Sequence, residues 1–484
     1  MAESQRDQVS EGSVLLIAVV ASFITPFMVS AVQIALPAIG KEFSISAVML
    51  GWVATAYILS AAIFLVPFGK GADIYGRKRM FFIGILVYTA ASLLCAVAPT
   101  IKFLIAFRAV QGIGASMMFS PSTAIVVSVI PPGRRGRAIG ITTAAVYVGL
   151  SLGPLIGGLL TQYLGWRSIF FLSVPLGLFE VALVAWKLKG EWRDLRGERF
   201  DPTGAFLYGL GLACLMYGFS KLPSASGFMF LCGGILGLAF FVFWELRTRH
   251  PILHIDLFAK NRVFAFSNLA ALINYSASSA VTFLLSLYLQ YVKALTPREA
   301  GVVLVSQPIV MAVFSPFAGR LSDRVESRIV ASIGMALTAV ALFFFIFLGA
   351  GTSLVAVIAD LMLLGLGFAL FSSPNTNAVM SSVEAGLYGV ASATLGTMRM
   401  TGQMLSMGIA MLIFAMQIGT VQISSAPRDS FLTSLTIAFT IFAILSFVGV
   451  FASLARGNVR QGGETGGEPA GGGARSNRIP SPRR

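Results

Sequence analysis

The segment GKGADIYGRKRM, residues 69–80, lies between two long apolar runs, 46–69 and 79–98. Each run has close to the roughly 20 residues that a helix needs to cross the hydrocarbon core of a bilayer. Three consecutive basic residues, Arg77 to Arg79, stand just before the second run. Short loops rich in lysine and arginine are typical of the cytoplasmic side of a membrane. The segment therefore predicts two spanning helices joined on the inner side.

The composition of the whole chain agrees with a protein embedded in lipid. Hydrophobic residues make up 56% of the 484 residues and charged residues only 11%, with a mean hydropathy of +0.83. A soluble protein carries about 25% charged residues, so lipid is the expected outer solvent. Apolar runs of sufficient length predict an all-α membrane protein with fourteen transmembrane helices, at 13–37, 46–69, 79–98, 101–129, 137–162, 168–188, 203–219, 226–247, 264–292, 298–319, 328–349, 353–378, 386–417 and 431–455.

The distribution of positive charge predicts the orientation of these helices. With the N-terminus inside, the inner segments hold 26 of the 35 lysines and arginines and the outer segments hold seven. This bias predicts a multi-pass protein of the plasma (cytoplasmic) membrane with both termini cytoplasmic. It also accounts for the net charge of +15 without a nucleic-acid partner.

An internal repeat divides the chain into two similar halves. Gly69-Lys-Gly-Ala-Asp73 recurs as Gly319-Arg-Leu-Ser-Asp323, and the glycine, proline and threonine pattern of 112–123 recurs in 365–376. We predict a six-helix half at 1–190, two extra linker helices at 191–262, a second six-helix half at 263–456 and a disordered basic tail at 457–484. Two facing helical halves are typical of transporters. A duplicated membrane scaffold without transport is the alternative.

Two motifs carry a resemblance to a known family. The arrangement of Gly69, Asp73, Gly76 and Arg77 in the opening segment resembles the signature loop of the major facilitator superfamily. The resemblance implies that Asp73 faces a helix N-terminus of the other half, near Gly389, and that the basic residues hold the loop at the anionic leaflet. The motif of residues 149–158 resembles that of the antiporter branch, where it implies a flexible seal between the halves, with its glycines and proline at Gly149, Gly153, Pro154, Gly157 and Gly158.

Further motifs resemble the fourteen-helix drug:proton antiporter family in particular. These are Arg108-Ala-Val-Gln111-Gly112, Trp166-Arg167-x-x-Phe170 and Phe200-Asp201-x-x-Gly204. The resemblance implies the major facilitator fold with two extra central helices. One departure affects coupling: the first helix of the family usually carries an aspartate where this chain has Met28, and Gln33 replaces a usual asparagine.

Four ionisable residues lie well inside the predicted spans. They are Arg108, Glu180, Asp360 and Arg399, and charged groups at such depth are costly and are candidates for function. Asp360 and Arg399 are each expected about 10 Å from the outer surface and could form a pair. The resemblance places Arg108, Asp360 and Arg399 on cavity-lining helices and Glu180 on a supporting helix. Five polar residues could line the cavity or serve ordinary helix packing: Tyr57, Gln111, Tyr147, Asn274 and Gln403.

The resulting functional prediction is a secondary active transporter, preferably a proton-coupled exporter of amphipathic drugs or related small molecules, as in antibiotic resistance. With Met28 in place of the usual acid, Asp360 is the preferred titrating group and Glu180 the next. The alternative is an exporter or facilitator of an ordinary metabolite with different coupling. The sequence shows no phosphate loop and no nucleophile with a base, so we predict no enzyme activity and no cofactor. His250 and His254 make a poor metal site, and a monomer is expected.

Overall fold

The computed structural model describes residues 10–192, 198–384, 387–419 and 427–457, and every regular element within them is helical. Fourteen helices in these described parts are long and apolar enough to cross a membrane. The predicted all-α class and the predicted number of spans are therefore confirmed. The tail, for which we predict disorder, lies outside the described residues from 458 onward.

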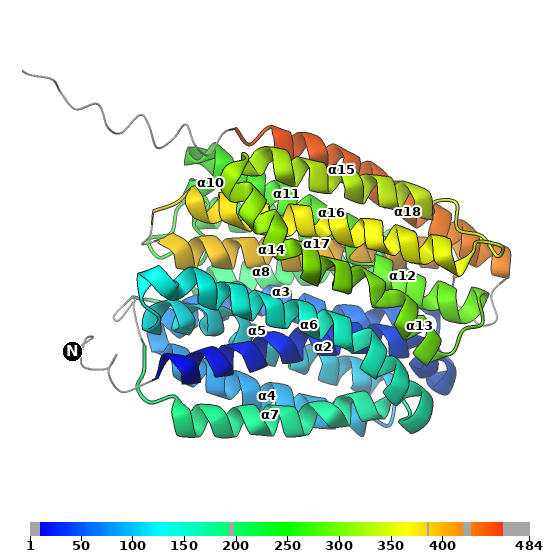
Figure 1. Cartoon of the computed structure of the whole chain (residues 1–484), viewed down its shortest axis with the longest axis horizontal. Coiled ribbons are helices and arrows are strands. Elements are labelled where there is room, and N and C mark those ends of the chain that lie inside the picture. Colours follow the sequence, from blue (N-terminus) through cyan, green and yellow to red (C-terminus); the bar gives the residue numbers. More distant parts are fainter. Residues whose placement is uncertain (1–9, 193–197, 385–386, 420–426, 458–484) are drawn as a thin grey trace, which may run out of the picture.

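The first six helices run back and forth beside one another and are drawn in blue to cyan-green in Figure 1. We call them the N-terminal half, and we call the end of the bundle where the first helix begins the N-face. Their bounds are α2 (Glu11–Phe43), α3 (Ala47–Tyr75), α4 (Arg77–Ala96), α5 (Ile101–Val129), α6 (Pro132–Leu164) and α7 (Arg167–Lys187).

The elements from residue 262 onward form the C-terminal half. Their bounds are α11 (Arg262–Ser278), α12 (Val281–Leu287), a π-helix η1 (Tyr288–Val292), α13 (Pro297–Leu304), α14 (Ser306–Arg324), α15 (Ser327–Phe345), α16 (Leu354–Ser381), α17 (Tyr388–Gln417) and α18 (Arg428–Leu454). Two predicted spans are thus interrupted. At the first interruption the N–H of Ala280 donates to the Ser406 hydroxyl at 2.9 Å, which satisfies a backbone group where the helix ends.

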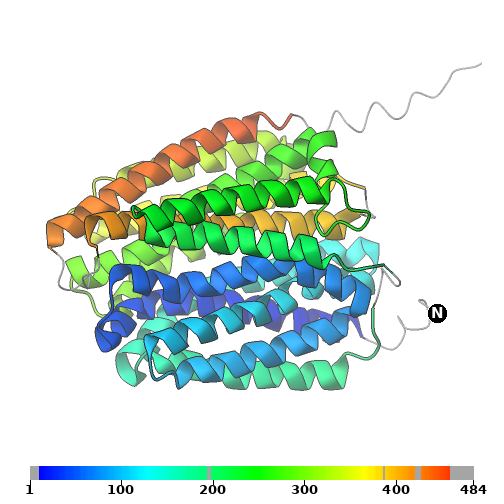
Figure 2. The same ribbon diagram turned by 180° about the vertical axis from the view of Figure 1, so that it is seen from behind.

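Two extra helices, α8 (Pro202–Lys221) and α9 (Ala225–Glu245), and the short α10 (Asp256–Lys260) lie between the halves in sequence. Figure 2 shows the green pair lying across the boundary between the blue and the orange helices. Tyr208 of α8 donates to the Ala62 carbonyl of α3 at 3.3 Å. Phe219 of the same helix lies 3.1 Å from the place where a Cβ on Gly408 of α17 would stand. The α8 helix therefore packs on both halves.

Matching glycines hold matching helices close in the two halves. A Cβ on Gly84 of α4 would lie 3.0 Å from the Gly114 carbonyl oxygen of α5. A Cβ on Gly334 of α15 would lie 2.6 Å from the Gly367 carbonyl oxygen of α16. Only glycine permits such close backbone approach. The pair Gly84 and Gly334 extends the repeat that the sequence indicates at Gly114 and Gly367.

The two halves contact each other strongly at the end opposite the N-face. The Ser286 hydroxyl of α12 donates to the Gln33 carbonyl of α2 at 2.9 Å, and Gln290 donates to the Ile34 carbonyl at 3.0 Å. A Cβ on Gly158 of α6 would lie 2.5 Å from the Pro297 carbonyl oxygen of α13. These contacts fasten α2 and α6 to α12 and α13, so the halves are closed together at this end.

Candidate functional site

A buried arginine organises the interior of the N-terminal half. Arg108 of α5 is 1% exposed, and its Nε donates to the Val53 carbonyl of α3 at 3.1 Å. A second nitrogen donates to Gln111 Oε1 at 2.5 Å, and the Gln111 amide donates to the Ser92 hydroxyl of α4 at 2.7 Å. The chain Arg108–Gln111–Ser92 therefore ties three helices together through neutral acceptors.

The Arg108 guanidinium also lies over an aromatic ring. Its central carbon is 4.5 Å from the centroid of the Tyr57 ring, a cation–π arrangement. Within the described residues no carboxylate lies within ion-pair distance of Arg108. The structure thus brings Arg108, Gln111 and Tyr57 together, and the cluster carries a positive charge that no acid neutralises.

Glu180 of α7 is fully buried, and neither of its carboxylate oxygens has a hydrogen-bond partner among the described residues. One turn earlier, Gly177 lies in close contact with the Thr89 side chain of α4. Tyr88 of α4 lies within electrostatic range of both Arg108 and Glu180. Burying an ionised carboxylate without a partner is costly, so Glu180 is a candidate for function by its position alone.

The residue in place of the family's usual acid contacts the same helix. Met28 of α2 is fully buried, and the Ser173 hydroxyl of α7 lies 2.6 Å from its sulfur. Ser173 and Glu180 are seven residues apart and lie on one face of α7. The face that carries the buried carboxyl is therefore the face that packs on Met28.

An aromatic cluster occupies the middle of the molecule between the halves. Tyr147 of α6 packs with Tyr275 of α11 and Phe368 of α16, and its hydroxyl accepts a hydrogen bond from Ser315 of α14 at 3.1 Å. The rings of Tyr275 and Phe368 meet edge to face at 5.2 Å. We call Tyr147, Tyr275 and Phe368 the central aromatic cluster.

Arg399 of α17 borders the central aromatic cluster. Its guanidinium carbon lies 5.8 Å from the Tyr275 ring centroid, and one nitrogen donates to the Thr376 hydroxyl of α16 at 2.6 Å. Its Nε is buried without a partner among the described residues. Arg399 is thus a second cation inside the bundle, half-buried, and no carboxylate of the described residues forms an ion pair with it.

The expected pair between Asp360 and Arg399 is wrong. Thr376, the partner of Arg399, follows Asp360 by sixteen residues on α16, which is about 24 Å along a helix. Arg399 therefore lies toward the N-face, whereas Asp360 lies near the opposite end. The expected depth treats the membrane as about 30 Å thick, whereas the 30 residues of α17 make a helix about 45 Å long. Asp360 is half-buried, and its Oδ1 has no partner within the described part of the chain.

Two of the predicted polar residues stand apart from these clusters. Asn274 of α11 is fully buried, and both atoms of its amide lack a partner in the described residues. Gln403 is half-buried and follows Arg399 by one turn, so the two share a face of α17.

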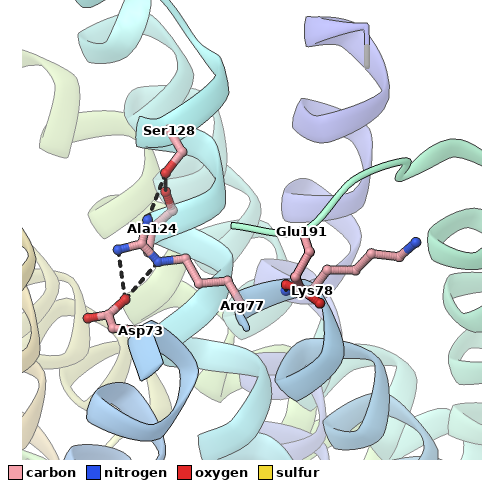
Figure 3. Close-up of polar contacts among 6 residues, drawn as sticks. All are labelled: Asp73, Arg77, Lys78, Ala124, Ser128 and Glu191. Atoms are coloured by element: carbon pink, nitrogen blue, oxygen red, sulfur yellow. Dashed lines mark hydrogen bonds and ion pairs between the residues drawn. The ribbon is translucent and has the colours of Figure 1, made fainter. Parts of the chain in front are cut away.

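The signature loop between α3 and α4 contains an internal salt bridge. Figure 3 shows Arg77 between Asp73 and Ser128, with distances of 2.7 Å to each. Arg77 is only 7% exposed, so the expectation that it contacts the anionic leaflet is wrong. The reason is that Asp73 and Ser128 of α5, both half-buried, accept its hydrogen bonds and hold the guanidinium inside the bundle. Gly69 is buried at the same end of α3.

An acid that the sequence analysis did not single out caps the second helix of this loop. Both oxygens of Glu191 accept from backbone N–H groups at the start of α4, one from Lys78 at 2.8 Å and the other from Arg79 at 3.2 Å. Figure 3 shows Glu191 beside Lys78. Gly76 has a φ of +123°, and a Cβ there would lie 2.5 Å from the Glu191 carboxyl carbon. Glu191 follows α7 by a few residues without any helix-cap pattern, so no signal in the sequence indicates it.

The glycine stripe of α6 packs within its own half. Cβ atoms on Gly149 and Gly157 would lie 2.6 Å from the Phe23 carbonyl oxygen and 2.8 Å from the Ala31 Cα, both on α2. The neighbouring residues contact the other half: Gly158 approaches Pro297, and the Pro154 carbonyl meets Gly301 of α13. Gly153 also packs on α2, against Phe27 and Ser30. Within the motif of residues 149–158, contact with the other half is therefore made by Pro154 and Gly158, and the glycine stripe contacts α2.

Comparison with known proteins adds independent information. The family model described as Major Facilitator Superfamily matches residues 18–243 and 268–480. The chain is similar to a cephamycin export protein of Amycolatopsis lactamdurans, with 31% identity over 91% of this chain and 93% of that protein. It is 30% identical to a tetracenomycin C resistance and export protein of Streptomyces glaucescens over 81% of this chain and 73% of that protein.

Two further similarities are to a riboflavin transporter and to a solved transporter structure. The chain is 29% identical to the riboflavin transporter RibZ of Clostridioides difficile over 91% of this chain and 96% of that protein. A crystal structure of a bacterial homologue of the human lysosomal transporter Spinster, in an inward-facing conformation, matches with a TM-score of 0.68 at 16% identity, covering 95% of this chain and 99% of that chain. This likeness concerns the fold alone.

Proposed function

Because this chain belongs to the major facilitator superfamily, we propose that it couples proton entry to the export of amphipathic drugs or related small molecules. The chain is a membrane transporter, and its relatives include antibiotic export and multidrug resistance proteins. The direction, the coupling ion and the substrate class are the proposed parts. We also propose a plasma-membrane location with both termini cytoplasmic, so that the N-face is the inner face, and a monomeric state.

The observation that carries the coupling proposal is the isolation of Glu180. A coupling group must be able to gain and lose a proton during the cycle, and arginine cannot do so. Glu180 is buried without a partner among the described residues, and Phe170 of the same helix lies 6.0 Å from the guanidinium carbon of Arg108. A proton leaving Glu180 would create a carboxylate that Arg108 attracts, which would favour a different packing of α4, α5 and α7.

Asp360 remains the second candidate for the coupling acid. It lies near the end opposite the N-face, is half-buried and has one unpartnered oxygen. Since Arg399 is far from it along the membrane normal, a proton lost from Asp360 would leave a charge without a nearby cation. For that reason Glu180 is the first candidate for the coupling acid and Asp360 is the second.

The central aromatic cluster and Arg399 suit an amphipathic substrate that is neutral or acidic. Aromatic faces contact planar apolar groups well, and Arg399 offers an unpaired Nε. No carboxylate of the described residues lies within ion-pair distance of Arg399. The centre of the molecule would therefore repel a cationic substrate and attract an anionic one.

A different coupling with an ordinary metabolite is the second candidate function. Met28 replaces the usual acid and is fully buried, and the relative RibZ is named for a vitamin. This function predicts saturable substrate movement that a proton gradient neither drives nor changes.

A proteoliposome assay tests these proposals. Substrate-dependent proton release is measured for a panel of acidic, neutral and cationic amphipathic compounds and for riboflavin, in the wild type, Glu180→Gln and Asp360→Asn. We expect that Glu180→Gln retains substrate exchange but loses gradient-driven transport, whereas Asp360→Asn keeps both. Gradient-driven transport by Glu180→Gln at the wild-type rate would remove Glu180 from the mechanism. Transport of the panel without any proton movement would favour the second function.

A further inference from the structure

A buried arginine at the end of α18 has unused hydrogen-bonding capacity. Arg456 is fully buried, its Nε donates to the Ser453 carbonyl at 2.9 Å and one terminal nitrogen donates to the Ser453 hydroxyl at 2.5 Å. The other terminal nitrogen is buried without a partner among the described residues. Capping the C-terminus of α18 therefore uses only part of the guanidinium.

Two more arginines, Arg328 and Arg262, lie near the same end of α18. The Ser332 hydroxyl of α15 lies 2.8 Å from the Ser453 hydroxyl and donates to the Arg328 carbonyl at 2.7 Å. The Nε of Arg328 is also buried without a partner in the described part of the chain. Arg262, at the start of α11, donates to the Ala455 carbonyl at 2.9 Å. We call Arg262, Arg328 and Arg456 the arginine triad.

The triad has no acidic counterpart. No carboxylate within the described ranges lies within 4.0 Å of a side-chain nitrogen of these three arginines. Burial and the neighbouring Arg328 lower the pKa of Arg456 to about 10. The N-termini of α11 and α15 add positive potential because helix dipoles point that way. The C-terminal carbonyls of α18 offset part of this charge through Arg262 and Arg456, and no carboxylate of the described residues neutralises the rest.

The surroundings indicate what kind of anion fits. The triad lies at the N-face ends of three segments that are long and apolar enough to span a membrane, where lipid head groups are expected. Large apolar side chains next to it are exposed on the outer surface, at Ile329 and Ile333 of α15 and at Phe451 and Leu454 of α18. Arg262 is exposed and Arg328 half-buried, so the triad opens toward this apolar surface.

From this arrangement we infer that the arginine triad binds the phosphate of an anionic phospholipid, whose acyl chains lie along the exposed faces of α15 and α18. Guanidinium groups bind phosphate oxygens through paired charge-assisted hydrogen bonds. The lipid would neutralise the triad and hold the inner ends of α11, α15 and α18 together. This site is separate from the proposed transport pathway.

Thermal unfolding and native mass spectrometry of the purified full-length protein test the inference. The probes are phosphatidylglycerol, phosphatidylcholine and inorganic phosphate, added to lipid-depleted protein. We expect phosphatidylglycerol to raise the melting temperature by about 3 °C or more, with little effect from the other two. Arg328→Gln should bind phosphatidylglycerol about tenfold more weakly, and Arg328→Lys should bind with intermediate strength.

Arg249→Gln is the matched control, because Arg249 is an exposed basic residue between α9 and α10. It should bind phosphatidylglycerol as the wild type does. Equal stabilisation of the wild type by phosphatidylcholine would overturn the inference, and so would full phosphatidylglycerol binding by Arg328→Gln. An equal rise with inorganic phosphate alone would show a free-anion site and overturn the lipid assignment. Because Arg328 is only half-buried, its variant should fold even where Arg456→Gln does not.

Discussion

Glu180 of α7 and Arg108 of α5 lie in the same half on helices that both pack against α4, and yet no ion pair among the described residues joins them. An ion pair formed in every state of the cycle would hold both charges fixed and would only add stability. Separation instead leaves Arg108 satisfied by Gln111, Val53 and the Tyr57 ring while the carboxyl of Glu180 has no partner. Neutral partners thus keep the arginine in place, and the acid remains free to change charge.

At this scale, Gln111 should contribute to stability through its bridge. Gln111→Leu leaves one Arg108 nitrogen without its acceptor, while the Ser92 hydroxyl loses the bond that it accepts from Gln111 and keeps the one that it donates to the Tyr88 carbonyl. We expect a loss of about 1–3 kcal/mol in unfolding free energy, measured as a lower melting temperature in detergent. Gln403→Leu is the control, since Gln403 is half-buried and should tolerate the change. An unchanged melting temperature for Gln111→Leu would mean that another group satisfies Arg108.

The sequence identifies the right residue types but not their neighbours. Arg108 and Gln111 stand out because charge and amide groups in apolar runs are costly, and their spacing of three places them on one helix face. The partners Ser92 and Thr376 are ordinary hydroxyl residues of a kind found in many membrane helices, where they often bond to a carbonyl of their own helix. Which of them meets an arginine depends on the rotation of a neighbouring helix, and hydropathy carries no information on that rotation.

The packing of α6 on α2 explains the glycine stripe at the scale of elements. Gly153 meets the Ser30 hydroxyl, and a Cβ there would lie 2.8 Å from the Phe27 carbonyl oxygen. Gly157 is similarly tight, with the Ala31 Cα at 2.8 Å. The two helices therefore touch backbone to backbone over two turns, and movement of α6 must carry α2 with it.

We expect Gly153→Ala to force the helices apart and to cost about 1–3 kcal/mol by overpacking. Gly157→Ala should have a similar effect, because its obstacle is backbone as well. Gly140→Ala on the same helix is the control, since nothing lies within 4 Å of its added Cβ. Melting temperatures of the three variants check the prediction. Gly140→Ala should keep or raise the melting temperature, because alanine has the higher helix propensity. A loss in Gly140→Ala equal to that in Gly153→Ala would contradict the packing explanation, since the added Cβ at position 140 meets no neighbour.

Element prediction from sequence succeeds where length and polarity decide and fails where packing decides. Apolar runs locate all fourteen spans because each must match the bilayer. The interruption at Ala280 has no proline or glycine to mark it and depends on Ser406 of another helix. The sequence also misplaces Arg399 in depth, because the 30 residues of α17 extend beyond the hydrocarbon layer.

The two halves contact each other directly at one end of the molecule, and α8 packs on both halves along one side. Hydrogen bonds from α12 to α2 and contacts from α13 to α6 close the end opposite the N-face. The α8 helix contacts both α3 and α17 and so spans the boundary between the halves (Figure 2). Relative movement of the halves must therefore open the first set of contacts while α8 follows one half or the other.

The proposed orientation is testable with single cysteines in a variant that lacks Cys95, Cys214 and Cys232. Ser226 lies in the exposed first turn of α9, away from the N-face, and Lys189 is exposed near the N-face. In intact cells Ser226→Cys should react with an impermeant maleimide, whereas Lys189→Cys should react only after permeabilisation. The reverse pattern would place the N-face outside and contradict the topology.

The last prediction concerns the closed end of the bundle. The Gln290 amide lies 3.0 Å from the Ile34 carbonyl, and one helical turn onward Ala38 is half-buried beside it. Cysteines at 290 and 38, in the cysteine-free background, should therefore be joined by a short bifunctional thiol reagent. If transport requires this end to open, the cross-link should abolish transport, and a reducing agent should restore it when the reagent is cleavable. Substrate binding should persist, because Tyr147, Tyr275 and Arg399 lie deeper in the molecule. Each single-cysteine variant treated in the same way is the control and should transport normally. Full transport by the cross-linked protein would mean that the halves do not separate at α2 and α12, and that substrate leaves by another route.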